Sequence, residues 1–208
     1  MYVCDHHNYA LPFILEKSKQ LKLNKLQTLI HADAHSDAFK NDKFNSTLYA
    51  KKFSKKQANK EKMEYFYSNT RINDWMISPL TQNNHIELNN WRWLNIVEKN
   101  KQPTLKATDY KNYLMGTNRF FNLSKFQNLD SAEIFDLDID ILTIPDNNLT
   151  EEEKSDILKG TIPNQILSFL RELAKLCNSA KIVTIATSPG FINQERAIIY
   201  VKKFLELI

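Results

Sequence analysis

Two apolar stretches of the chain, residues 26–30 and 134–142, adjoin or contain polar residues that alternate along the sequence. The alternating residues are Asp33, His35 and Asp37 after the first stretch, and Asp136, Asp138 and Asp140 within the second. Alternate residues of a β-strand point to the same face of a sheet, so each set can converge on one side while apolar neighbours fill the other. Any fold of this chain must therefore provide an environment for two acidic strand faces.

The second acidic set is the stronger constraint, because its three aspartates lie among isoleucine, leucine and phenylalanine residues. Carboxylates buried together without a cation would repel one another and take up protons at a high cost in free energy. A bound metal ion removes this difficulty. The first set, Asp33, His35 and Asp37, fits a solvated strand end as well as it fits a set of metal ligands. The prediction of a metal site therefore depends on both sets together.

Histidines gather in the same parts of the sequence. The chain has five, and four of them lie in two short segments: His6, His7, His31 and His35. The first pair lies between a short apolar segment at residues 2–4 and a helix-like pattern that starts at residue 10, which indicates a strand-to-helix junction. Mixed carboxylate and imidazole donors suit a divalent ion such as manganese, and a set of this size can hold two ions.

Apolar periodicity predicts strands and helices that alternate along the chain. We expect strands at residues 2–4, 26–32, 133–142 and 181–187, and helices at residues 10–21, 162–177 and 193–208. Thr150 and Glu153 form a capping-box pattern at the start of a further helix. This alternation predicts an α/β fold with a mainly parallel central sheet and helices on both faces, in which ligands gather beyond the carboxyl ends of the strands.

Some apolar residues can be assigned to the core from their spacing. The last predicted helix carries a stripe made of Ala197, Ile198, Val201, Phe204, Leu205 and Ile208. Trp93 is expected to be a core residue, whereas Trp75 and Trp91 fit either the core or the wall of a substrate cleft. The two cysteines, Cys4 and Cys177, are expected to be reduced thiols in the core.

Length and composition limit the classes of protein to consider. We expect residues 1–208 to form a single domain, because a chain of this size can bury a substantial core. The hydrophobic fraction of 42% and the charged fraction of 25% are ordinary for a soluble protein. The sequence has no apolar run of membrane-spanning length and no secretory signal pattern, so we expect a cytoplasmic protein without a membrane partner.

Nucleotide and nucleic-acid binding receive little support from the sequence. The chain has only three glycines, and neither a Walker loop nor a dinucleotide-binding glycine pattern occurs. Much of the net charge of +4 comes from lysines, six of which lie within residues 51–62. A solvated helix face explains that run better than a nucleic-acid site, so we expect no nucleic-acid partner.

Three motifs in the chain resemble, in the same order, the metal motifs of the arginase, agmatinase and deacetylase superfamily. They are Asp5-x-His7-Asn8-x-Ala10-Leu11, His31-x-Asp33-x-His35-x-Asp37 and Asp136-x-Asp138-x-Asp140. The sequence is most similar to the short bacterial peptide arginases, in which an Asn-x-Trp segment and a Thr-Ile-Ala-x-Ser-Pro segment recur. These segments correspond to residues 73–75 and 184–189 here. The resemblance spans nearly the whole chain and implies a three-layer, arginase-like fold.

The resemblance also implies a ligand set for two Mn²⁺ ions. The ligands by position are His7, Asp33, His35, Asp37, Asp138 and Asp140. Two alternatives stay open: His6 in place of His7, and Asp136 in place of Asp140. Asp37 is expected to bridge the two ions and to accept a proton from the attacking water.

The activity implied is a hydrolysis that converts arginine side chains of a ribosomally synthesised precursor peptide to ornithine and releases urea. We expect Asp37 to act in catalysis. Glu195 and His85 are further catalytic candidates, and their alternatives stay open: Glu195 also fits a helix start, and His85 a surface position. Asn73, Trp75 and Ser188 are the candidates for substrate binding. One alternative is another ureohydrolase or deacetylase-type amidohydrolase on the same fold, acting on an agmatine-like or acylated amine. Another is a non-enzymatic protein that keeps the metal for stability, and a homo-oligomer is compatible with each of these functions.

Overall fold

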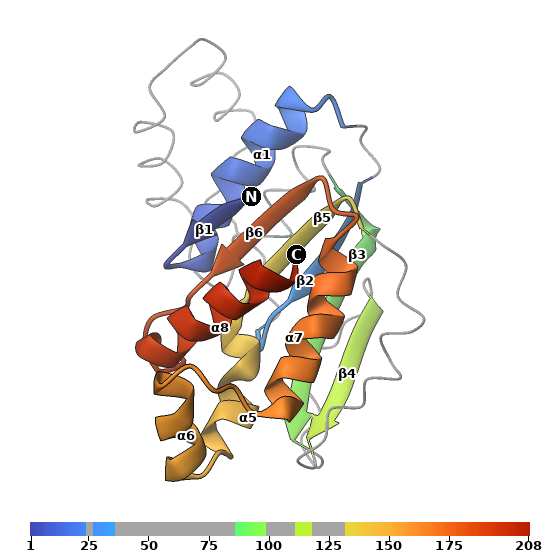
Figure 1. Cartoon of the computed structure of the whole chain (residues 1–208). Helices are drawn as coiled ribbons and strands as arrows, with labels where there is room; N and C mark the ends of the chain where they lie inside the picture. The colour runs from blue at the N-terminus through green and yellow to red at the C-terminus, as the bar shows by residue number, and fades with distance from the viewer. Residues whose placement is uncertain (24–26, 36–85, 99–110, 118–131) are drawn as a thin grey trace.

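The computed structural model describes residues 1–23, 27–35, 86–98, 111–117 and 132–208 (Figure 1). Within these residues, six strands form one sheet in the order β1-β6-β5-β2-β3-β4, and every pairing between them is parallel. The strands are β1 (Tyr2–Cys4), β2 (Gln27–Ala32), β3 (Ile86–Glu98), β4 (Lys111–Thr117), β5 (Ile134–Asp138) and β6 (Ile182–Ala186). The predicted α/β class with a parallel central sheet is therefore confirmed.

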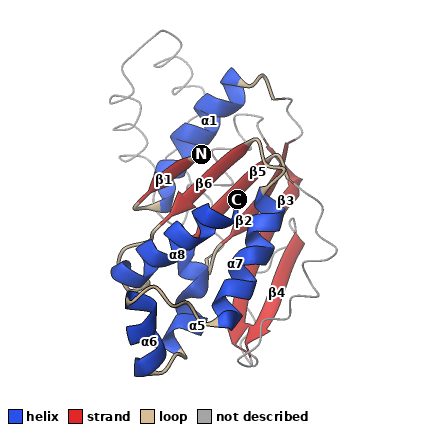
Figure 2. Cartoon of the chain, in the orientation of Figure 1, coloured by secondary structure: helices blue, strands red, loops and turns tan. Residues whose placement is uncertain are grey.

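Helices connect and cover these strands (Figure 2). The described α-helices are α1 (Ala10–Gln20), α5 (Thr143–Asn147), α6 (Glu151–Leu158), α7 (Asn164–Cys177) and α8 (Gln194–Leu207), and two 3₁₀ helices, η1 (His7–Tyr9) and η3 (Ile139–Leu142), follow β1 and β5. The predicted capping box is present at the start of α6, where Thr150 Oγ1 accepts from the Glu153 N–H and the Glu153 carboxylate accepts from the Thr150 N–H. No helix in the described part of the chain combines the length and apolar character that a membrane crossing needs.

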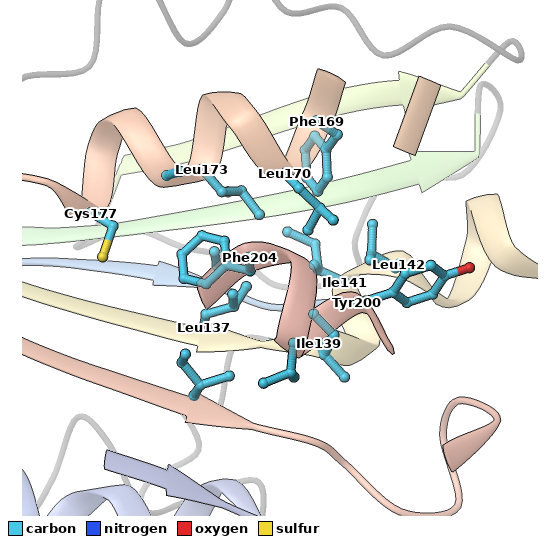
Figure 3. Close-up of a cluster of buried hydrophobic side chains, with 14 of the residues drawn as sticks. Leu137, Ile139, Ile141, Leu142, Phe169, Leu170, Leu173, Cys177, Tyr200 and Phe204 are labelled. Atoms are coloured by element: carbon cyan, nitrogen blue, oxygen red, sulfur yellow. The ribbon is translucent and has the colours of Figure 1, made fainter. Parts of the chain in front are cut away.

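One face of the sheet packs against α7 and α8, which lie together over the central strands (Figure 1). Leu137 of β5 lies in this cluster with Leu173 of α7 and Phe204 of α8 (Figure 3). The rings of Phe135 and Phe204 stack with their centroids 6.1 Å apart. Full burial of one such side chain contributes about 1.5 to 3 kcal/mol, so this layer supplies much of the stability of the fold.

The opposite face of the same strands is also buried. Leu29, Ile134 and Ile182 alternate with the residues of the first cluster and are at most 1% exposed. Helix α1 packs against β6 and β1, and its Leu11 and Ile14 side chains are fully buried outside the first cluster. The sheet is thus enclosed on both faces, which gives a three-layer arrangement.

The chain reverses its direction of travel across the sheet between β2 and β5. From β2 it proceeds outward to β3 and β4, and it then returns to β5 on the other side of β2 before reaching β6. At such a switch point the connections leave the two neighbouring strands in opposite directions, and a crevice opens beyond their carboxyl ends. The two acidic motifs of the sequence follow these two strands.

The strand predicted at residues 133–142 is wrong in its second half. Strand β5 ends at Asp138, and residues Ile139–Leu142 form η3. The reason is local capping, because Asp138 Oδ1 accepts the backbone N–H of Asp140 at 2.9 Å and stabilises a helical start. Asp140 therefore does not share a strand face with Asp136.

The apolar stripe predicted for the last helix is also wrong in part. The buried residues of α8 are Ala197, Tyr200, Val201 and Phe204, whereas three predicted members, Ile198, Leu205 and Ile208, are 38% to 45% exposed. A tyrosine fits the buried stripe because its hydroxyl donates to Asp146 at 2.8 Å. Cys4 and Cys177 are both buried and free, as predicted.

Candidate metal centre

Acidic and imidazole side chains from three parts of the chain meet at the carboxyl ends of β1, β2 and β5. The contributing residues are His7 after β1, His31 at the end of β2, Asp33 and His35 just after β2, Asp136 and Asp138 in β5, and Asp140 in η3. Parallel pairing explains the convergence, because β2 and β5 are neighbours in register and all parallel strands end at the same edge of the sheet. We refer to these seven residues as the His-Asp cluster.

The inner part of the His-Asp cluster is fully enclosed. His7 Nδ1 lies 2.9 Å from Asp33 Oδ2, and His7 Nε2 lies 2.8 Å from Asp136 Oδ2. His31 contacts the same two carboxylates, with Nε2 3.2 Å from Asp33 Oδ2 and Nδ1 2.7 Å from Asp136 Oδ2. All four side chains are at most 1% exposed, so their charges interact without screening by bulk water.

The outer part reaches the protein surface. His35 Nδ1 lies 3.0 Å from Asp140 Oδ2 and 3.6 Å from Asp33 Oδ1, and the His35 side chain is 51% exposed. Asp140 is itself buried and accepts the backbone N–H of Ala34 at 3.2 Å through Oδ1. The cluster therefore has a closed inner end at His7 and His31 and an open end at His35.

Neighbouring groups on β3 and the backbone hold the segment after β2 in place. The Trp93 indole N–H donates to the Asp33 carbonyl at 2.9 Å, and the Asn95 amide donates to the Ala34 carbonyl at 3.1 Å. The His35 N–H donates to Asp33 Oδ1 at 2.6 Å. Trp93 is buried, as the sequence predicted, and it also fixes the loop that carries two cluster residues.

Two hydroxyl groups from β6 and the turn after it complete the carboxylate contacts. Thr184 Oγ1 donates to Asp136 Oδ1, and Ser188 Oγ donates to Asp138 Oδ2. Thr184 stands opposite Asp136 in the β5–β6 register, and Asp136 stands opposite His31 in the β2–β5 register. His31, Asp136 and Thr184 are thus register neighbours on three adjacent strands. Their side chains form a continuous polar line on the sheet face opposite α7 and α8.

Electrostatic interactions shift the pKa values of the imidazoles strongly. Burial opposes protonation of His31, but the carboxylates of Asp33 and Asp136 outweigh it and raise its pKa to about 10. Burial also opposes protonation of His7, but the carboxylates of Asp136 and Asp138 outweigh it and raise its pKa well above the usual value. Hydrogen bonds to Asp140 and Asp33 raise the pKa of His35 to about 11. The cluster thus offsets its carboxylate charge with protons on imidazoles.

The carboxylates respond in two directions. Burial alone would raise the pKa of Asp136, but His7 and His31 lower it to about 2. Asp140 behaves in the opposite way, because burial and the nearby charges of Asp138 and Asp33 raise its pKa well above the ordinary value. The outer end of the cluster is therefore the place where negative charge is least compensated.

Thiol chemistry does not fit this site. Cys4 lies at the end of β1 and donates from Sγ to the Ile185 carbonyl. Burial raises the pKa of its thiol to about 12, so thiolate is scarce at neutral pH. The reactive groups of the described site are therefore carboxylates and imidazoles.

The structure brings most of the sequence-predicted ligands together. His7, Asp33, His35, Asp138 and Asp140 all lie in the cluster, and so does the alternative ligand Asp136. The alternative to His7 was His6. The His6 ring instead lies edge-on to Tyr9, with the ring centroids 5.7 Å apart.

Sequence reasoning did not count His31 as a member of the ligand set. The structure groups His31 with His7 and Asp33, with one possible ligand atom from each within 4.8 Å of the others. His31 lies near the end of β2, two residues before Asp33, and that spacing is the sequence signal that points to it.

Other predicted site residues lie elsewhere. Asp37, Asn73, Trp75 and His85 fall outside the described residues. Glu195 is exposed in the first turn of α8, where a carboxylate is favoured by the helix dipole, and it takes no part in the ion pairs of the described cluster. Ser188 is buried, and its hydroxyl is used by Asp138.

The donor chemistry of the cluster fits a divalent metal ion. A second group of possible ligand atoms, from Asp33, His35 and Asp140, also lies within 4.8 Å and shares Asp33 with the first group. Imidazole nitrogen and carboxylate oxygen together suit borderline divalent ions, and imidazoles bind metals in their neutral form. A cation would therefore take over the charge balance that the imidazole protons provide.

No family model matches the sequence, and no curated protein matches it. Among solved structures, the chain is similar to proclavaminate amidino hydrolase from Streptomyces clavuligerus, with a TM-score of 0.49 and 12% sequence identity. The alignment covers 99% of this chain and 62% of that chain, so this chain spans less than two thirds of the length of the protein it matches.

Proposed function

We propose that this protein is a metal-dependent hydrolase of the arginase, agmatinase and deacetylase type, and that it converts arginine side chains of a precursor peptide to ornithine. The observation that carries this proposal is the convergence of His7, Asp33, His35, Asp138 and Asp140 at a switch point of a parallel sheet. The order of the three motifs along the sequence supports it, as does the Thr-Ile-Ala-Thr-Ser-Pro segment at the end of β6.

We expect the cluster to hold two Mn²⁺ ions, with the predicted Asp37 completing the ligand set. Two divalent ions at such a centre supply Lewis acidity and lower the pKa of water to near neutrality. The shared position of Asp33 in both groups of possible ligand atoms supports a centre with two ions, because one carboxylate can serve both. Manganese is our choice because the donors are oxygen and imidazole nitrogen without thiolate.

The residues around the cluster divide the remaining tasks. The enclosed side of His7 and His31 excludes bulk water, whereas the half-exposed His35 marks the side from which a side chain can enter. Asp37 is our candidate for the group that accepts a proton from water, and His85 is our candidate proton donor to the departing amine. Water adds to the guanidinium carbon, the bond to the side-chain nitrogen breaks, and the products are urea and ornithine.

The substrate side of the proposal is a peptide, in a cytoplasmic setting. We expect an arginine side chain to reach the centre while the peptide backbone stays at its mouth, with Asn73 and Trp75 as contacts. Binding energy from the peptide then helps to orient the guanidinium group. On this basis free arginine and agmatine are much poorer substrates than an arginine inside a peptide.

Urea release is the direct test. The full chain, loaded with Mn²⁺, is incubated with an arginine-containing peptide, with free arginine and with agmatine at equal concentration. We expect most urea from the peptide, whose mass falls by that of cyanamide, and about two manganese ions per chain by elemental analysis. The matched control is Asp33→Asn, which keeps the side-chain shape and removes a charge from both groups of possible ligands.

Three results would contradict parts of the proposal. Faster turnover of free arginine or agmatine would reject the peptide substrate and leave the metal centre intact. Deacetylation without urea release would indicate the amidohydrolase alternative. A single zinc ion per chain would reject the assignment of two manganese ions.

A further inference from the structure

Ser188 has an unusual backbone conformation at the edge of the His-Asp cluster. Its φ of 46° lies in the left-handed region, which a residue with a Cβ rarely adopts. Within the described residues, the only other non-glycine residue of this kind is Lys22, just past the end of α1. Glycine would adopt the Ser188 conformation without steric cost, whereas serine adds a hydroxyl group at this position.

The surrounding turn holds Ser188 in this conformation. Its backbone N–H donates to the Asp5 carbonyl at 2.9 Å, and its carbonyl accepts from the Phe191 N–H at 3.2 Å. One residue earlier, the Thr187 N–H donates to the Cys4 carbonyl at 3.0 Å. The disfavoured conformation persists because contacts with Cys4 and Asp5 before Ser188 and with Phe191 after it fix the backbone on both sides.

The side chain of Ser188 acts on one oxygen of Asp138. Asp138 Oδ1 accepts the backbone N–H of Asp140, and Asp138 Oδ2 accepts the Ser188 hydroxyl. The same Oδ2 lies 3.1 Å from His7 Nδ1. Both oxygens of the carboxylate are thus oriented by hydrogen bonds, and the Ser188 hydroxyl, on a residue only 4% exposed, is not free for substrate.

We propose that Ser188 is a positioning residue that orients the Asp138 carboxylate for metal binding, and that its disfavoured backbone conformation is kept for this purpose. The proposal rests on the metal centre of the proposed function and replaces the substrate-binding role expected from the sequence. Hydrogen-bond partners of metal-binding carboxylates fix the ligand geometry, and their loss typically costs about 10-fold to 100-fold in metal affinity.

Two variants separate this role from a purely structural one. Ser188→Ala and Ser188→Gly both remove the hydroxyl, but only glycine also relieves the backbone conformation. We expect both variants of the full chain to bind Mn²⁺ at least about 10-fold more weakly than the wild type in calorimetric titration. After chelator treatment, the glycine variant melts at a higher temperature than the alanine variant. Metal affinity and thermal stability are therefore expected to respond differently.

A neighbouring hydroxyl supplies the matched control. Thr187→Val removes a buried hydroxyl one residue earlier, which lies 3.4 Å from Asp5 Oδ1 and not at Asp138. This variant is expected to bind Mn²⁺ with wild-type affinity. If Thr187→Val also binds Mn²⁺ more weakly than the wild type, any disturbance of this turn reduces metal affinity. That result would overturn a specific role for Ser188.

The remaining outcomes separate this proposal from the proposed function. Wild-type Mn²⁺ affinity in both Ser188 variants overturns the positioning role alone. Affinity that follows melting temperature, with glycine near the wild type and alanine weak, overturns it as well. Wild-type protein that binds Mn²⁺ without releasing urea rejects the proposed reaction, while the titrations still decide the role of Ser188. Wild-type protein that binds no Mn²⁺ overturns both.

Discussion

Two buried charged groups in this protein are built on different principles. The first consists of Asp146 in α5 with Arg196 and Tyr200 in α8. Asp146 Oδ1 accepts from Arg196 Nε at 2.8 Å and from the Tyr200 hydroxyl at 2.8 Å, and Oδ2 accepts from Arg196 Nη2 at 2.6 Å. One carboxylate meets one guanidinium with parallel hydrogen bonds, so this group is balanced and closed.

The His-Asp cluster is not closed in this way. It holds four buried aspartates, and in the described part of the chain their partners are imidazoles, hydroxyls and backbone N–H groups. An arginine keeps its proton at any ordinary pH, whereas an imidazole can lose its proton to make way for a metal ion. The comparison teaches that a buried carboxylate paired with arginine has a fixed partner and stabilises the fold. A buried carboxylate paired with histidine can exchange the imidazole proton for a metal ion.

The largest effect is expected from breaking the closed group. Asp146→Ala leaves the largely buried Arg196 without its partner and should lower the free energy of unfolding by about 3 kcal/mol, measured by urea denaturation. Mn²⁺ affinity should stay near the wild type after refolding is verified. The double variant Asp146→Leu with Arg196→Met removes both charges and should be less destabilised. A loss in Mn²⁺ affinity that matches the loss in stability would contradict the separation of the two groups.

A second prediction compares two aspartates inside the open cluster. Asp138→Asn should weaken Mn²⁺ binding by about 10-fold or more, because this carboxylate lies among the predicted ligands and is oriented by hydrogen bonds at both oxygens. Asp136→Asn should affect stability more than affinity, because Asp136 contacts His7, His31 and Thr184 in the fully enclosed part. Thermal melts and calorimetric titrations of both variants provide the test. Equal losses of affinity would show that the ligand register is wrong.

The smallest effect concerns the open end of the cluster. Phe191 is 45% exposed, and its ring lies edge-on to His35 with the centroids 5.1 Å apart. An exposed aromatic at this position can contact an incoming guanidinium group, an interaction of about 0.5 to 1 kcal/mol at exposed sites. Phe191→Ala should therefore raise the KM for an arginine peptide a few-fold with kcat and Mn²⁺ affinity little changed. Phe191→Tyr is the matched control, and an unchanged KM in Phe191→Ala would place substrate entry elsewhere.

The parts of the fold that sequence predicted well are those fixed by local apolar patterns. The strands at residues 2–4 and 181–187 and the capping box at Thr150 match the structure closely because each has a clear pattern in the local sequence. The end of β5 was missed because the Asp138 side chain caps η3, which competes with the strand pattern that continues through residue 142.

The site was predictable as a set of motifs but not as a set of contacts. Alternation indicated that Asp33 and His35 would gather with later aspartates, yet the pairing of His31 with Asp136 depends on β2 and β5 being neighbours, 105 residues apart in sequence. The ion pair between Asp146 and Arg196 joins residues 50 positions apart and left no sequence pattern. The backbone conformation of Ser188 depends on contacts with Asp5 at the other end of the chain.

The short strand β1 has a consequence for how the protein opens. It pairs with β6 at the edge of the described sheet through only three residues, and such a short edge element is expected to separate from the sheet more easily than the central strands. His7 follows β1 directly and lies 2.9 Å from Asp33, in the loop after the central strand β2. Detachment of β1 would also move His7 away from Asp33, so we expect the proposed metal ions to exchange when this edge strand opens.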